Sequence, residues 1–283
     1  LRTLPVDETN LLRFVDILIL TGFAVAAIGL FQFTLGESII TAEEGARRLA
    51  SVYGSPNNVG LFLGRCIPFA LVFVLLKFDR RRRFLSGFAL GIMFIAALLT
   101  QSSGTLFIGI PVALVIVFTL AYRSQAILPI IGLGLITIVG FAFALQFPRF
   151  SNLLDFSQGT DFYRLRVWDS AINIIADHPV TGIGLDQFLY MFRGEYIMPD
   201  AWEEPTLSHP HNFVLDFWTR LGLPGIIWFI GVQVVFWRII QLNYTRLFHD
   251  NRIRLSLLIG VAGSMTNLLA HGLIDNSVFV LDL

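Results

Sequence analysis

The chain has 283 residues, of which 55% are hydrophobic and only 14% are charged, and its formal net charge is zero. Soluble domains are about 45–50% apolar and about 25% charged, so this surplus of apolar side chains excludes an ordinary soluble domain and predicts an integral membrane protein. The zero net charge does not indicate nucleic-acid binding, and the single cysteine, Cys66, excludes an internal disulfide and a cysteine metal cluster.

Seven stretches are long and apolar enough to be predicted as membrane-spanning helices, which need about 20 mostly apolar residues. They run over roughly 12–33, 59–78, 85–99, 104–122, 127–147, 222–240 and 255–273. We therefore expect a single membrane domain over residues 1–283, with an all-α fold: a polytopic transmembrane helical bundle. Because the chain begins without methionine and ends in an apolar run that starts near Val278, we expect it to be an internal fragment of a larger protein.

Basic residues in the short loops predict the orientation. Lys77 and the arginines at 80–83 make the second loop cytoplasmic, and alternation places Arg123 and the basic residues between 238 and 254 on the same side. The segments 35–58 and 148–210 are then external. The second external segment is rich in acidic residues: Asp155, Asp161, Asp169, Asp177, Asp186, Glu195, Asp200, Glu203 and Glu204.

The large external loop at 148–210 contains a predicted amphipathic helix, from Asp161 to Ala176. Asp161 is a suitable N-cap, and the helix should stop before Asp177-His178-Pro179. Its predicted apolar stripe consists of Phe162, Leu165, Trp168, Ile172 and Ile175. We expect this helix to lie along the membrane surface and to cover the bundle.

The segment Ser208-His209-Pro210-His211-Asn212 precedes the sixth predicted span. If Ser208 or His209 caps a helix and Pro210 is its first residue, His211 lies in the first turn, where the helix dipole favours a neutral imidazole. A neutral imidazole is a suitable general base near pH 7. The alternative is an interfacial histidine bonded to a backbone carbonyl.

Two features follow that segment. Gly222-Leu223-Pro224-Gly225 predicts a break in the helix rather than a binding loop, and Asp216 and Arg220 are spaced as an ion pair on a helix surface.

Several arginines are candidates for binding a diphosphate, because a guanidinium group is a bidentate donor. Arg164 and Arg166 point about 200° apart on the loop helix; Arg164 is the better candidate, and Arg166 is expected to be solvated or paired with Asp169 or Ser170. Arg48 adds positive charge to the first external loop. Arg65 lies inside the second span, where an ionisable group marks either a functional site or an ion pair within the bundle.

His271 and Asp275 are four residues apart on one helix face, which allows either a charge-relay partner or a packing hydrogen bond. His209 and His211 alone do not make a metal site, because no cysteine and no nearby histidine or glutamate accompanies them. We expect neither a metal nor a cofactor.

These motifs together resemble the O-antigen ligase and O-antigen polymerase superfamily. The resemblance rests on His211-Asn212 followed by Gly222-Leu223-Pro224-Gly225, on Arg164 with Trp168 and then His178-Pro179 and Gly182-Ile183-Gly184, and on Pro56-Asn57 after Arg48. It covers roughly residues 47–275. One departure is Ser102-Ser103-Gly104, where many members carry Ser-Arg-Gly.

The resemblance implies a metal-independent enzyme of the bacterial inner membrane with its large loop on the periplasmic side. It would transfer a glycan from a polyprenyl diphosphate carrier to a hydroxyl of a glycan, lipid or protein acceptor. His211 would be the base, and Arg164, Arg48, Arg65 and Arg166 would stabilise the diphosphate. Supporting residues would be Asn212, His209, Asn57, His271 and Asp275.

Three alternatives stay open from the sequence. A polymerase or a protein O-oligosaccharyltransferase of the same superfamily would use the same chemistry on another acceptor. A transporter or flippase for an anionic lipid would use the same arginines without chemistry. A structural subunit would give no reason for Arg65 or His211.

Overall fold

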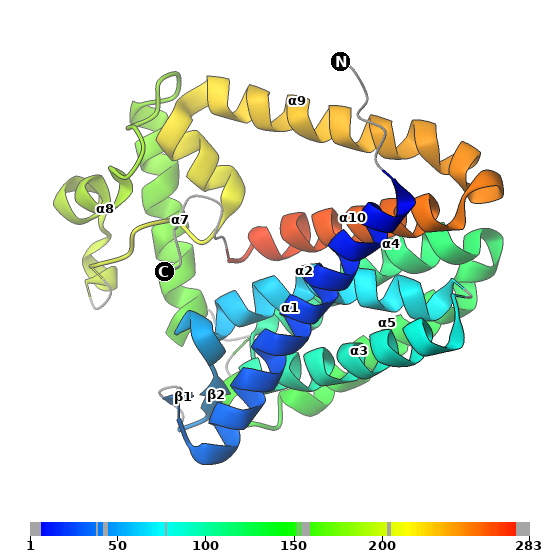
Figure 1. The fold of residues 1–283 in the computed structure, drawn as a ribbon. Helices are drawn as coiled ribbons and strands as arrows, with labels where there is room; N and C mark the ends of the chain where they lie inside the picture. Colours follow the sequence, from blue (N-terminus) through cyan, green and yellow to red (C-terminus); the bar gives the residue numbers. More distant parts are fainter. Residues whose placement is uncertain are drawn as a thin grey trace. The chain divides into compact units, whose positions relative to one another are not determined.

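In the computed structural model, the described part of the protein is almost entirely helical. The described residues are 7–37, 39–41, 45–76, 78–151, 153, 159–202 and 205–275. The predicted all-α membrane fold is confirmed: among the described residues, six helical segments are long and apolar enough to cross a membrane. Figure 1 shows these helices in sequence colours. Lys77, Asp155, Glu203, Glu204 and the apolar run from Val278 lie outside the described residues.

The chain divides into two compact units. The first contains residues 1–143 and 239–271, and the second contains residues 144–238 and 272–283. The long helix α9 (Phe213–Asp250) contributes to both units.

The first unit contains helices α1 (Glu8–Leu35), α2 (Pro56–Leu75), α3 (Arg80–Thr100), α4 (Ile110–Tyr122) and most of α5 (Ile127–Ala144) and α10 (Arg252–Gly272). A π-helical segment, η2 (Gly104–Gly109), leads into α4. A short turn, η3 (Arg123–Ala126), reverses the chain between α4 and α5 (Figure 1). The single helical segment at 104–144 therefore contains two of the seven predicted crossings.

Part of the first predicted external segment forms a small hairpin. Strands β1 (Ile39–Thr41) and β2 (Arg47–Leu49) pair antiparallel, with Ile39 opposite Leu49, and a short 3-10 turn, η1 (Ser51–Tyr53), follows. Leu49 is buried in the core of the first unit, which anchors the hairpin to the bundle.

Small residues allow the helices of the first unit to approach closely, as is usual in membrane bundles. A Cβ at Gly64 of α2 would lie only 2.5 Å from the side chain of Asn267 on α10. Gly260 of α10 faces Phe69 equally closely, at 2.4 Å. The glycines of both helices therefore fix the packing of α10 against α2.

The second unit contains α7 (Gly159–Asp177), the N-terminal part of α9 and several short helical segments: α6 (Pro148–Ser151), α8 (Phe188–Met191), the π-helical η4 (Phe192–Tyr196) and η5 (Pro199–Ala201). Its core consists of Val167, Ala171 and Ile174 of α7 packed with Phe188 and Phe192. The residues of α7 that pack in this core are not those of the predicted apolar stripe, of which Leu165 and Ile172 are exposed. The predicted cap is also wrong, since α7 begins at Gly159, two residues before Asp161.

Candidate active site

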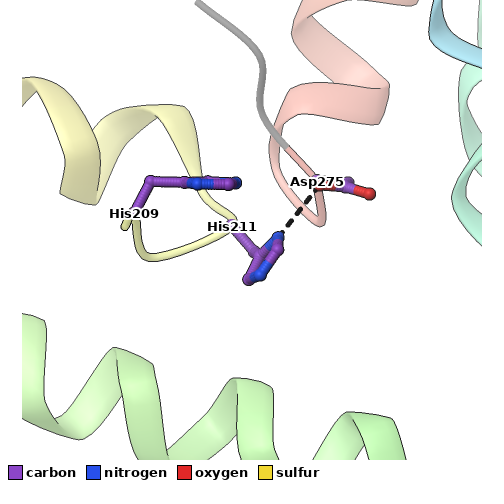
Figure 2. A group of neighbouring side chains, drawn as sticks. All are labelled: His209, His211 and Asp275. Atoms are coloured by element: carbon purple, nitrogen blue, oxygen red, sulfur yellow. Dashed lines mark hydrogen bonds and ion pairs between the residues drawn. The ribbon is translucent and has the colours of Figure 1, made fainter. Parts of the chain in front are cut away.

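A histidine–carboxylate pair lies immediately before α9. Nδ1 of His211 is 3.0 Å from Oδ1 of Asp275, and their side chains are 22% and 8% exposed. Because an ionised carboxylate only accepts hydrogen bonds, Nδ1 carries the proton that faces Asp275, and in the neutral form of the ring Nε2 is then an acceptor. In Figure 2, the dashed bond to Asp275 leaves one edge of the His211 ring, and the opposite edge points away from Asp275. The pair thus presents a basic nitrogen whose orientation is fixed by a carboxylate.

Asn212, rather than Ser208 or His209, caps the helix. Its Oδ1 accepts hydrogen bonds from the backbone N–H groups of Val214 and Leu215, at 2.9 and 3.2 Å, and its Nδ2 donates to the carbonyl of Leu273. The prediction that His211 lies in the first helical turn is therefore wrong: His211 precedes the cap and has a positive φ of 51°. Such backbone strain in a non-glycine residue is concentrated at functional sites.

His209 lies beside the pair, with its ring centroid 4.3 Å from that of His211 (Figure 2). Desolvation lowers the pKa of His209 to about 3, with a further lowering from the neighbouring His211. The imidazole of His209 is therefore neutral at physiological pH, and it hydrogen-bonds with Oγ of Ser208.

The three side chains also have the ligand atoms of a metal site, since those of His209, His211 and Asp275 lie within 4.8 Å of one another. Two imidazoles and a carboxylate would suit Zn²⁺, which such sites bind at about 2.0–2.2 Å. The hydrogen bond between His211 and Asp275 accounts for the same arrangement without an ion.

A buried arginine holds the segment that carries His211. Nη2 of Arg220 donates to the carbonyl of Ser208 at 2.9 Å, and its Nε contacts Oδ1 of Asp216 at 2.6 Å. Asp216 and Arg220 are 0% and 2% exposed, so the prediction of an ion pair was right but its placement on the helix surface was wrong. Asp186, which the sequence did not indicate as a partner, also contacts Arg220, at 3.4 Å.

The glycine motifs interlock two stretches of backbone. Ile183 and Gly184 donate to the carbonyls of Thr219 and Arg220, at 2.7 and 3.0 Å, and Leu223 donates to the carbonyl of Pro179 at 3.1 Å. Gly222 has a positive φ of 62°, which confirms the predicted helix break. The segment 179–184 is thereby fixed against the break in α9.

Only glycine fits at position 222. A Cβ there would lie 2.1 Å from the carbonyl oxygen of Val180, and the positive φ adds strain for any other residue. We expect Gly222→Ala to lower the free energy of unfolding by about 3 kcal/mol or more, since backbone strain alone costs about 1–3 kcal/mol. Denaturation of the protein in detergent measures this loss.

Gly231→Ala is the matched control for Gly222→Ala. It lies on the same helix, and nothing within 4 Å would meet its Cβ. A helical Gly→Ala change in open space should be neutral or slightly stabilising. Equal stability of the two variants would contradict the backbone interlock.

Trp168 joins α7 to the same segment, because its Nε1 donates to the carbonyl of Pro210 at 2.8 Å. Arg164 precedes Trp168 by one helical turn, about 5.4 Å, and its Nη1 pairs with Asp161 at 2.9 Å. Arg166 pairs with both Asp169 and Asp200, at 3.3 and 2.7 Å, so the expected pairing with Asp169 is confirmed. Among the described residues, Arg164 therefore has one carboxylate partner, whereas Arg166 has two.

The remaining predicted site residues lie in the first unit. Nε of Arg48 donates to the carbonyl of Thr100 at 2.9 Å, and its Nη2 donates to Oδ1 of Asn57 at 2.8 Å. Arg48 thus ties β2 to the end of α3 and the start of α2.

Arg65 is partly buried within α2, and His271 is fully buried, with its ring against Gly104. The gathering of Arg48 and Arg65 around His211 stays a prediction.

Comparison with known proteins indicates the family of the chain. A curated protein of Rickettsia conorii, named "Putative polysaccharide ligase", is 33% identical over 78 residues. That alignment covers 26% of this chain and 19% of the relative, so the chain spans a small part of the relative's length. Residues 88–230, about half of the chain, match the profile of the O-antigen ligase family. This chain therefore belongs to the O-antigen ligase family.

Proposed function

We propose that the protein transfers a glycan from a polyprenyl diphosphate carrier to an acceptor hydroxyl at the outer face of the bacterial inner membrane. Its family and its membrane-spanning helices support glycan transfer in a membrane. The His211–Asp275 pair is the single observation that carries the proposal, because it supplies an oriented base. The arginines in the first turn of α3, Arg80 to Arg83, support the orientation, since basic residues at the ends of spans favour the cytoplasmic side.

In the proposed reaction, Nε2 of His211 accepts the proton of the acceptor hydroxyl. The acceptor oxygen then forms a bond to the anomeric carbon of the donor sugar. The bond between that carbon and the diphosphate oxygen breaks, and polyprenyl diphosphate leaves with both electrons. Asp275 stabilises the imidazolium that forms, as an orienting carboxylate does in other histidine-dependent transfers.

Arg164 is proposed to stabilise the charge that develops on the leaving diphosphate. Its position one turn from Trp168, which contacts the His211 segment, supports this role. The diphosphate would compete with Asp161 for the guanidinium group. Arg48, Arg65 and Arg166 are proposed as further contributors, with Arg166 the weakest because two carboxylates already bind it.

We expect Arg164→Lys to lower kcat/KM by about 10- to 100-fold, because lysine keeps the charge but loses the bidentate geometry. The measurement is glycan transfer by purified protein in lipid nanodiscs. Arg193→Lys, in η4, is the control, because no ion pair to Arg193 occurs among the described residues. Wild-type kinetics for Arg164→Lys would assign Arg164 a structural role.

The test of the function is transfer from a purified polyprenyl diphosphate-linked glycan to an acceptor, with and without EDTA. Transfer with release of polyprenyl diphosphate in both conditions would support a metal-independent enzyme. Transfer that EDTA abolishes and Zn²⁺ restores would instead assign His209, His211 and Asp275 to a metal. Movement of the intact carrier lipid across a vesicle membrane without transfer would support the transporter.

A further inference from the structure

A groove of about 620 Å³ lies in the first unit between α1 and α3. Its walls are apolar: Ile19, Leu20 and Phe23 of α1, and Leu85, Phe88 and Ala89 of α3. The rings of Phe23 and Phe88 lie 5.8 Å apart at one end of the groove. The groove runs about 10 Å along α3 between Arg81 and Phe88, at 1.5 Å per residue, so its shape and polarity fit a hydrocarbon chain.

The other end of the groove is charged. Nη2 of Arg82 pairs with Asp16 at 2.7 Å, and its guanidinium group lies 5.4 Å from the ring centre of Phe73. Oδ1 of Asp79 accepts a hydrogen bond from the backbone N–H of Arg82 and caps α3. The guanidinium group of Arg82 is therefore already bound by Asp16 and packed near Phe73.

Arg81 differs from Arg82 in its surroundings. It lines the groove and is exposed, and no ion pair to it occurs among the described residues. A cation therefore lies at the charged end of an apolar groove, which is the arrangement that an anionic lipid requires.

We propose that this groove binds one anionic phospholipid, with an acyl chain between α1 and α3 and the headgroup phosphate on Arg81. Inorganic phosphate would leave the apolar walls unused, and a zwitterionic lipid would bring no net negative charge to Arg81. The proposal is independent of the glycan-transfer reaction, because it uses none of the residues assigned to that site.

Native mass spectrometry of the purified full chain tests the proposal, after delipidation and titration with phosphatidylglycerol or phosphatidylcholine. We expect one phosphatidylglycerol molecule to bind more tightly than phosphatidylcholine. Arg81→Gln should weaken phosphatidylglycerol binding by about five-fold, which corresponds to about 1 kcal/mol per basic residue near a lipid surface. Ala89→Phe should fill the groove and weaken the binding of both lipids.

Arg83→Gln is the matched control, because it removes the same charge from the same helix but does not line the groove. It should leave phosphatidylglycerol affinity within about two-fold, since an exposed charge off the site contributes little. Equal binding of the two lipids, or equal effects of Arg81→Gln and Arg83→Gln, would overturn the proposal. Since Arg81 is exposed, its substitution stays informative even if Ala89→Phe does not fold.

Discussion

Replacing His211 with alanine is expected to lower kcat for glycan transfer by about 100- to 10,000-fold, the range that a positioned acid–base group contributes. In the proposed reaction, the imidazole removes the acceptor proton through Nε2, while its Nδ1 contacts Asp275. Binding of the carrier should be retained, because in this account the arginines hold the diphosphate. The measurement is single-turnover transfer in nanodiscs, with donor binding measured in parallel.

His249→Ala is the control for that experiment, because His249 is an exposed histidine at the far end of α9. It should transfer glycan at the wild-type rate. If His211→Ala transferred as fast as this control, His211 would not be the base. If it lost donor binding and transfer together, His211 would be a binding residue.

Asp216→Asn is expected to lower the free energy of unfolding by about 3–5 kcal/mol, the cost of leaving a buried charge without its partner. The guanidinium group of Arg220 would remain buried beside a neutral amide, and its hydrogen bond to Ser208 would no longer be supported. The His211 segment should then lose its position, so transfer should fall as well. Denaturation of the protein in detergent measures the stability.

The control for Asp216→Asn is Asp186→Asn. Asp186 also contacts Arg220, but its side chain is 89% exposed, so solvent screens the interaction. We expect a loss of at most about 1 kcal/mol, the upper range for exposed ion pairs. Similar losses in the two variants would contradict the central role of the buried pair.

The sequence predicts the membrane bundle because period and hydropathy are local properties of each helix. The sequence also predicts the break at Gly222, because glycine and proline restrict or free the backbone at their own positions. The close approach of Gly222 to Val180 could not be read from the sequence, because it joins segments about 40 residues apart.

The arrangement of the site was harder to predict. Spacing showed that Asp216 and Arg220 are neighbours on a helix, but burial depends on what packs over them. The i,i+4 spacing of His271 and Asp275 placed them on one helix face, yet α10 ends at Gly272 and Asp275 contacts His211 from 64 residues away. Asn212 is a preferred N-cap residue, and that preference was the missed signal for the start of α9.

The most direct test of the histidine–carboxylate pair is a double-mutant cycle on kcat/KM for glycan transfer. It compares His211→Ala, Asp275→Asn and the double variant in the same nanodisc assay. If Asp275 acts through His211, the double variant will be no slower than His211→Ala alone. Losses that multiply in the double variant would show that the two residues act independently, and would contradict the assignment of Asp275 as the orienting partner of the base.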